Sequence, residues 1–121
     1  MSQECIGIKA FTAGEALAAY RRVKLTAAGT VSYADADEPE IGVTEAAAAS
    51  GARVAVALKG GRTHKCVAAG AVTVNAAIYG MADGKVDDTA TGSGSAVIGL
   101  ALETALADGD VIECILECNL A

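Results

Sequence analysis

The sequence has 121 residues, a formal net charge of −6 and 53% hydrophobic residues, but only 3% aromatic residues. Its length fits a single domain, residues 1–121, with a core of its own. Acidic charge repels phosphate and few aromatic side chains are available to stack on bases, so nucleic-acid binding is not expected. Membrane insertion and export are not expected either. No apolar stretch nears the roughly 20 residues of a spanning helix, and residues 1–5 lack a signal-peptide pattern.

The charge is divided unevenly along the chain. Residues 1–60 carry 6 basic and 7 acidic groups, a net charge of −1, whereas residues 61–121 carry 3 and 8, a net charge of −5. This acidity is expected to keep a chain rich in small apolar residues in solution.

The beginning of the chain allows more than one interpretation. Residues 1–10 fit either a first strand or an N-terminal arm that becomes ordered only against a neighbour. Phe11–Ala19 has alanines that favour a helix, but Gly14 and the short length favour a loop. Both segments therefore stay open.

A clearer strand pattern follows. Arg22 and Lys24 alternate with Val23 and Leu25, which predicts one polar face and one apolar face. Ala28-Gly29 predicts the turn after this strand.

Ala34–Glu40 is predicted to be a solvated polar loop. Its carboxylates do not follow the spacing of an EF-hand calcium loop, and a proline interrupts them; they are Asp35, Asp37, Glu38 and Glu40. The same interpretation applies to Asp83, Asp87 and Asp88.

Several later segments indicate turns. Four consecutive alanines in Thr44–Ser50 are compatible with a single helical turn. Gly60-Gly61 and Asp83-Gly84 each predict a hairpin between extended segments. The composition of Asp87–Ser95 predicts a flexible surface loop.

One pattern occurs twice, in residues 20–58 and again in residues 77–117. Each copy reads as strand, glycine turn, strand, polar loop, strand, loop and strand. The matching pieces are Val23–Val31 with Ile78–Val86, Ile41-Gly42-Val43 with Ile98-Gly99-Leu100, and Gly51 with Gly109. This spacing predicts an all-β fold, a compact β-barrel or β-sandwich of short antiparallel strands, with an internal pseudo-repeat and no long helix.

The sequence offers few candidates for chemistry. His64 and Cys66 share a face of an alternating segment, but a nucleophilic pair also needs a third, orienting group, and a surface histidine is the favoured interpretation. Gly92–Ser95 lacks the further residues of a phosphate-binding loop. No catalytic, cofactor-binding or metal-binding residue is assigned, and neither a cofactor nor enzymatic activity is expected.

The four cysteines are predicted to be reduced and buried. Cys114 and Cys118 are spaced too widely for the usual zinc pair, and on a strand they share the face of Ile112 and Leu116. A disulfide between Cys5 and Cys118 would require the two ends of the chain to pair.

Lys85 follows a hairpin-like Asp83-Gly84, which invites comparison with lipoyl or biotinyl carrier domains. The neighbours of the modified lysine in those domains do not match Gly84-Lys85-Val86. A carrier domain, or a small ligand-binding β-barrel, is therefore kept as the alternative function.

Most of the chain, about residues 10–117, resembles a family of short phage head proteins described as capsid cement or decoration proteins. Its most specific segments are Ile98–Glu103 and Gly109–Leu116. Asn75-Ala76 departs from the Gly-Asp pair usual in that family.

This resemblance implies a non-enzymatic virion protein, made in the host cytoplasm, that binds the exterior of a phage capsid. It would stabilise the lattice of the major capsid protein as a homo-oligomer, with a trimer favoured. The segments expected to dock are the N-terminal arm Ser2–Ala10 and the irregular loops Ala34–Glu40 and Asp87–Ser95.

Overall fold

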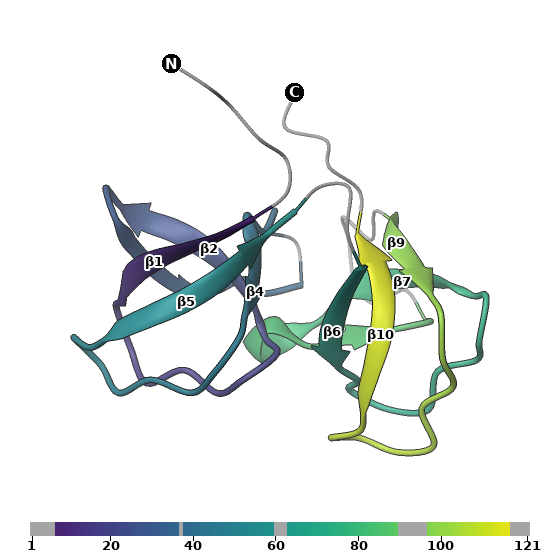
Figure 1. Cartoon of the computed structure of the whole chain (residues 1–121). Coiled ribbons are helices and arrows are strands. Elements are labelled where there is room, and N and C mark those ends of the chain that lie inside the picture. The colour runs from purple at the N-terminus through teal and green to yellow at the C-terminus, as the bar shows by residue number, and fades with distance from the viewer. Residues whose placement is uncertain (1–6, 37, 60–62, 90–96, 117–121) are drawn as a thin grey trace.

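The computed structural model describes residues 7–36, 38–59, 63–89 and 97–116, in which short strands build two curved sheets side by side (Figure 1). The first sheet contains β1 (Ile8–Ala13), β2 (Arg22–Ala27), β3 (Thr30–Tyr33), β4 (Gly42–Thr44) and β5 (Arg53–Leu58). The second contains β6 (Thr63–Val67), β7 (Ala77–Gly80), β8 (Val86–Asp87), β9 (Val97–Ala101) and β10 (Val111–Leu116), with a single 3₁₀ turn, η1 (Ala82–Gly84). The predicted all-β class without a long helix is therefore confirmed.

The first sheet closes into a barrel with the strand order β1-β3-β2-β4-β5. Its pairs are antiparallel except for β1 and β3, which run parallel through Thr12↔Thr30 and Ala13↔Val31. The expectation of antiparallel strands thus misses one pair. A parallel pair needs a long connection, and β2 supplies it by lying between β1 and β3 in the sequence.

The second sheet has the order β6-β10-β9-β7-β8, and the parallel bridge Ala68↔Val86 joins its two outer ends. We refer to β1–β5 as the first barrel and to β6–β10 as the second barrel. Each strand pair of one has a counterpart in the other: Val43↔Ala57 corresponds to Leu100↔Ile115, and Ala13↔Val31 corresponds to Ala68↔Val86.

The predicted internal pseudo-repeat is therefore present. The repeat that strand pairing defines also includes β1 and β6, which lie before the segments 20–58 and 77–117.

Each barrel has its own buried cluster of small apolar side chains. The first is formed around Val23, Val31 and Val56, and the second around Ile78, Ile112 and Leu116. Val43 belongs to β4 of the first barrel but packs into the cluster of the second. The two barrels are thus joined by apolar packing as well as by their sequence.

Two turn predictions have opposite outcomes. Asp83-Gly84 does connect paired strands, β7 and β8, and both residues have positive φ (58° and 72°), as tight hairpin turns require. Gly60-Gly61 does not: β5 pairs with β1 and β4, while β6 pairs with β10. The hairpin prediction there is wrong, because the segment joins the two barrels instead.

Where it describes them, the structure also decides between the alternative interpretations of the segments near the N-terminus. Ile8–Ala13 is strand β1, paired with β5, and residues 1–6 lie outside the described part of the chain. The alanines of Thr44–Ser50 form no helical turn, since Ala48 makes an antiparallel bridge with Leu17. In the described residues, no helix has the length and apolar character needed to cross a membrane.

Gly42 and Gly99 occupy corresponding positions in β4 and β9, where two backbones approach closely. A Cβ atom would lie 2.3 Å from the Ala57 carbonyl oxygen at Gly42, and 1.9 Å from the Ile115 carbonyl oxygen at Gly99. Any side chain would push the paired strands apart. The repeated Ile-Gly pattern therefore marks a steric requirement of this fold.

Gly99→Ala is expected to lower the free energy of unfolding by about 2 kcal/mol, because the paired strand must shift to admit the methyl group. Gly70→Ala is the matched control, since its Cβ would meet only a side-chain oxygen of Asp87 at 3.5 Å. Urea unfolding followed by circular dichroism measures both. Equal stability of the two variants would contradict the steric argument.

Candidate functional site

The junction of the two barrels is organised by the buried side chain of Arg22, on β2. Its guanidinium donates to the carbonyl oxygen of Ala34 at 2.9 Å, within the first barrel. It also donates to Met81 and Lys85 of the second barrel, with Nη2 2.8 Å from the Met81 carbonyl oxygen and Nε 3.1 Å from that of Lys85. One side chain thus donates hydrogen bonds to carbonyl oxygens of both barrels.

The charge of Arg22 is balanced by Glu40. Arg22 Nη1 lies 3.0 Å from Glu40 Oε1, and Lys59 Nζ lies 3.0 Å from Glu40 Oε2. All three side chains are at most 9% exposed. Buried ionic groups require such pairing, because an unpaired charge away from water is strongly unfavourable.

These positions correct two predictions from the sequence. Arg22 was expected on a polar, solvent-facing side of its strand, but it is fully buried, whereas Leu25 from the expected apolar side is 50% exposed. Ala34–Glu40 was expected to be a solvated docking loop. Its ends, Ala34 and Glu40, are buried at the junction, whereas Asp35 and Pro39 between them are exposed. The outer face of β2 is covered by the second barrel, and alternation within one strand does not reveal what covers a face.

The turn η1 of the second barrel docks onto the first. Gly84 N donates to the Ala34 carbonyl oxygen at 3.1 Å, and Arg21 Nη1 donates to the Asp83 carbonyl oxygen at 3.0 Å. A Cβ on Gly84 would lie 2.5 Å from the carbonyl oxygen of Arg22. Glycine is therefore required there both by positive φ and by the close approach of β2.

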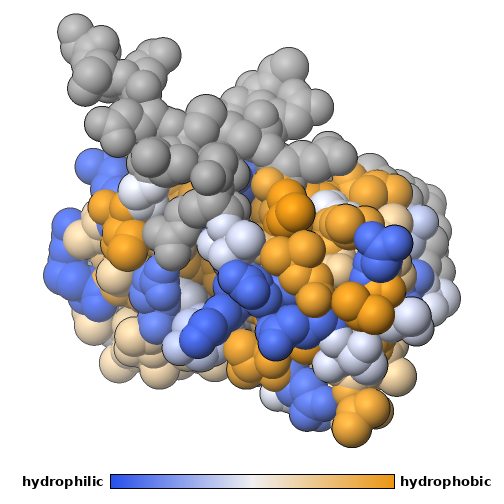
Figure 2. All heavy atoms as spheres, turned by 45° about the vertical axis from the view of Figure 1, so that its right-hand side comes forward, coloured by the Kyte–Doolittle hydropathy of each residue, from blue (hydrophilic) through white to orange (hydrophobic). Residues whose placement is uncertain are grey.

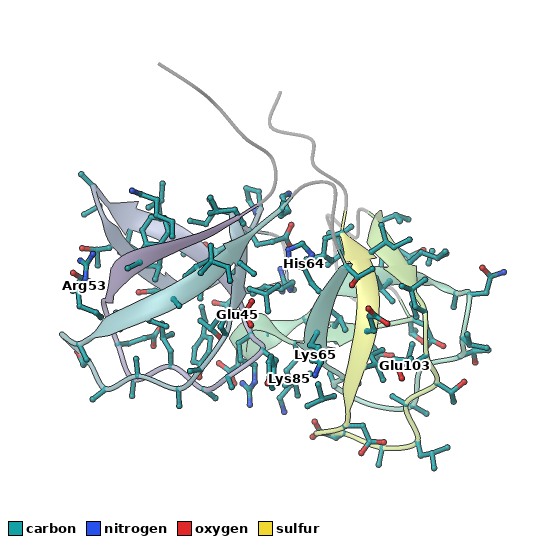
Figure 3. The ribbon with its side chains drawn as sticks, viewed as in Figure 1. Glu45, Arg53, His64, Lys65, Lys85 and Glu103 are labelled. Atoms are coloured by element: carbon teal, nitrogen blue, oxygen red, sulfur yellow. The ribbon has the colours of Figure 1, made fainter. Side chains whose placement is uncertain are left out.

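A cleft of about 160 Å³ opens beside this junction. Tyr20 and Glu45 line it from the first barrel, and His64, Lys65 and Glu113 from the second, with Val43, Thr44, Ala57 and Thr63 completing the wall. Figure 3 shows Glu45, His64 and Lys65 between the two barrels, whereas Arg53 lies at the far side of the first barrel.

His64 is buried rather than on the surface, which corrects the sequence interpretation. Its Nε2 lies 3.0 Å from the Leu58 carbonyl oxygen, so this ring also links β6 to β5. Cys66 shares the inward side of β6 with His64, as the alternation predicted.

The cysteines in the described residues, Cys66 and Cys114, are free thiols buried in the core of the second barrel. A hydrogen bond with Cys114, together with burial, raises the pKa of the Cys66 thiol well above its ordinary value. Since the thiolate is the reactive form, Cys66 has the character of a core side chain rather than of a nucleophile. Cys5 and Cys118, and any bond between them, lie outside the described residues.

The acidic groups singled out in the sequence are dispersed among local hydrogen bonds. Lys24 pairs with Glu38, and that hydrogen bond lowers the pKa of the Glu38 carboxyl. Asp88 accepts from the backbone N–H of Thr73, which lowers the pKa of Asp88. Within residues 7–36, 38–59, 63–89 and 97–116, no group of three His, Cys, Asp or Glu side chains is placed to hold a metal ion. Asp37 and Gly92–Ser95 lie outside these ranges.

Lys85 is held at the junction rather than presented on a free turn. Its Nζ lies 2.8 Å from Asp108 Oδ1, its side chain is 23% exposed, and its carbonyl oxygen accepts from Arg22. This placement does not favour a carrier domain, in which the modified lysine must reach into a partner enzyme.

A second surface feature was not predicted from the sequence. The outer side of β9 and β10 carries exposed apolar side chains, including Val97 (45%) and Ile115 (43%). Figure 2, in which this side of the molecule comes forward, shows apolar atoms gathered over the second barrel. Exposed contiguous apolar surface is typical of an interaction site.

The described parts of the molecule thus form two joined barrels with a buried ionic junction and an exposed apolar face. The sequence model of the phage cement protein family matches residues 6–116. The chain belongs to this family of phage head structural proteins, and the resemblance found in the sequence is confirmed.

One solved structure has the same fold along nearly the whole chain. It is the head fiber gp8.5 N base of bacteriophage phi29, with a TM-score of 0.75 and 18% sequence identity, covering 93% of this chain and 94% of that one. A comparison with curated proteins finds no match.

Arg22→Met is expected to lower the free energy of unfolding by about 3–5 kcal/mol, because it leaves Glu40 without its main partner and deprives carbonyl groups of both barrels of a donor. Arg53→Met is the matched control. Arg53 is exposed, with hydrogen bonds to Thr12 and Ala10, and its loss is expected to cost less than about 1 kcal/mol. Urea unfolding measures both, and a junction variant as stable as the control would contradict the structural role of Arg22.

The two core thiols are expected to resist alkylation in the folded protein. In a Cys5→Ser/Cys118→Ser variant, iodoacetamide at pH 8 should modify Cys66 and Cys114 at least about tenfold more slowly in buffer than in 8 M urea, since both thiols are fully buried and the hydrogen bond with Cys114, together with burial, also raises the pKa of Cys66. Intact-mass spectrometry measures the rate. Equal rates with and without urea would show that the thiols are accessible.

Proposed function

We propose that this protein is a capsid cement protein that binds the exterior of a phage head and stabilises the lattice of the major capsid protein. The observation that carries the proposal is the family match, which extends along residues 6–116 and so includes both barrels. On this proposal the protein is made in the host cytoplasm, is not an enzyme, needs no cofactor and is incorporated into the virion.

The architecture supports such a role. Two barrels built on short strands are fixed to each other by Arg22 and by the packing of Val43. We propose that the whole chain acts as one domain for this reason. A protein repeated many times over a lattice needs only weak individual contacts, because multivalent attachment adds their effects.

We further propose that the protein acts as a homo-oligomer, with three copies as the favoured number. The exposed apolar side of β9 and β10 supports association, because such surface is unfavourable in contact with water.

We also propose that the protein does not bind nucleic acid, because its acidic charge repels the phosphate groups of nucleic acid in the host cell.

Of the loop Ala34–Glu40, we propose that only the exposed middle, at Asp35 and Pro39, docks, because the two ends are buried at the junction. The other two proposed segments, Ser2–Ala10 and Asp87–Ser95, lie mostly outside the described residues. Of the arm, Ile8–Ala10 forms the beginning of strand β1, and the side chains of these three residues are exposed.

The test is binding to expanded capsids that lack the protein. Added protein should bind saturably in co-sedimentation and raise the temperature at which the capsids release DNA. Capsids that already carry the protein are the control and should bind no more. Absence of binding together with unchanged heat resistance would overturn the proposed function.

A further inference from the structure

The cleft between the two barrels is small and has a buried inner wall. Val43 and Ala57 form this wall together with His64, whose Nε2 lies 3.0 Å from the Leu58 carbonyl oxygen. At about 160 Å³ the cleft is smaller than the roughly 300–1,000 Å³ that drug-sized ligands occupy. It therefore has room for a single side chain or a single small ring.

The outer wall of the cleft is polar and carries charges of both signs. Glu45 comes from the first barrel and Lys65 and Glu113 from the second, and all three side chains reach solvent. Figure 3 shows Glu45 and Lys65 between the two barrels. Glu113 Oε2 accepts from Thr63 Oγ1 at 2.5 Å, so hydroxyl, carboxylate and ammonium groups share one opening.

Tyr20, which also lines the cleft, has an unfavourable backbone conformation. Its φ is 61°, in the left-handed region that a bulky side chain rarely adopts. Asn75 stands at the corresponding position of the second barrel, with φ 70°. Each donates its N–H to the last residue of the matching strand, Tyr20 to Thr44 and Asn75 to Ala101. The repeat therefore requires this conformation, and asparagine tolerates it better than tyrosine.

The first barrel thus keeps an aromatic ring at the cleft although the backbone favours a smaller residue there. Local strain of this kind is concentrated at functional sites. The ring of Tyr20 also packs against the core of the second barrel, which fixes its position. A ring held in this way loses little conformational freedom when a ligand stacks on it.

We propose that this cleft binds a neutral sugar ring, a pyranose unit of a glycan, stacked on Tyr20. One face of a pyranose presents C–H bonds that pack on an aromatic ring, and its hydroxyl groups both donate and accept. Glu45 and Glu113 accept hydrogen bonds from these hydroxyls, and Lys65 donates to them. The Lys65 ammonium lies 5.8 Å from the centre of the Tyr20 ring, on an exposed and flexible side chain that can yield the ring face to the sugar.

The mixed charges of the cleft favour a neutral ligand over an ion. An anion would lie beside Glu45 and Glu113, and a cation would lie beside Lys65. Such like-charge contacts are unfavourable at a binding site. A sugar hydroxyl meets no like charge and can use either kind of group.

A site of this size gives weak binding to one sugar ring, because few ligand atoms make contact. Many copies on one particle would bind a repetitive glycan far more tightly, through multivalent attachment. This consequence, though not the site itself, rests on the proposed function. It would give the virion a second partner besides the capsid, namely a polysaccharide surface.

The experiment titrates the full chain in solution with the methyl glycosides of glucose, galactose and N-acetylglucosamine, followed by amide-resolved NMR spectroscopy. At least one glycoside should shift the amide signals of the cleft residues saturably, with a dissociation constant on the order of 1 mM. Sodium acetate and methylammonium chloride are the ionic probes and should not shift these signals. Binding of either ion in place of every glycoside would overturn the choice of ligand.

Substitutions test the cleft directly. Tyr20→Asn introduces the residue of the second barrel, so the fold should persist, while sugar affinity falls at least about tenfold with the loss of the ring. Tyr20→Phe keeps the ring and should remain within about threefold of the native affinity.

Lys65→Met should also weaken binding, by about threefold or more, because a donor to the sugar is lost. Lys9→Met is its matched control: Lys9 Nζ lies 5.9 Å from the centre of the Phe11 ring, the same arrangement outside the cleft, and its loss should leave sugar affinity unchanged. Circular dichroism establishes that all variants are folded.

Signals that no glycoside shifts, or an affinity that Tyr20→Asn leaves unchanged, would overturn the proposed site. The two proposals fail separately. Protein that binds capsids but no glycoside would refute the sugar site alone, whereas protein that binds a glycoside but no capsids would refute the cement function alone.

Discussion

The position of the second barrel depends on one guanidinium group. Arg22 extends from the outer side of β2 and donates to carbonyl groups on either side of the junction, with Glu40 and Lys59 balancing the charge. A Cβ on Gly80 would lie 2.8 Å from the guanidinium carbon, so the absence of a side chain there makes room for Arg22. Directional bonds of this kind set orientation, which apolar packing alone would leave less defined.

Most of the fold could be predicted from the sequence because glycines stand at positions where the backbone admits no other residue. Gly42 and Gly99 stand where strands approach too closely for a side chain, and Gly84 stands where φ is positive. These requirements act through the local backbone, so their spacing carries the order of turns and strands. The parallel pairing of β1 with β3 could not be foreseen, because it depends on contacts between distant segments.

The burial of Arg22 at the junction could not be predicted from the sequence, for a physical reason. Arg22 and Lys24 alternate with apolar residues as solvent-facing charges do, and only the docking of a second barrel makes one of them buried and leaves the other on the rim. Gly60-Gly61 has the composition of a hairpin, although the strands around it belong to different barrels. A comparison of Arg22 with its counterpart Ala77 would have been a signal, since two copies of one pattern differ there in charge.

The junction within the chain and a contact between separate chains form under different conditions. Leu58 and Thr63 are close in the chain, so the two barrels meet at an effective concentration on the order of millimolar or higher, whatever the amount of protein. A junction with that advantage can contain desolvated charges that add orientation more than affinity. The proposed contact between chains lacks the tether and forms only as copies accumulate, so its apolar chemistry would make assembly respond to how much protein the infected cell has made.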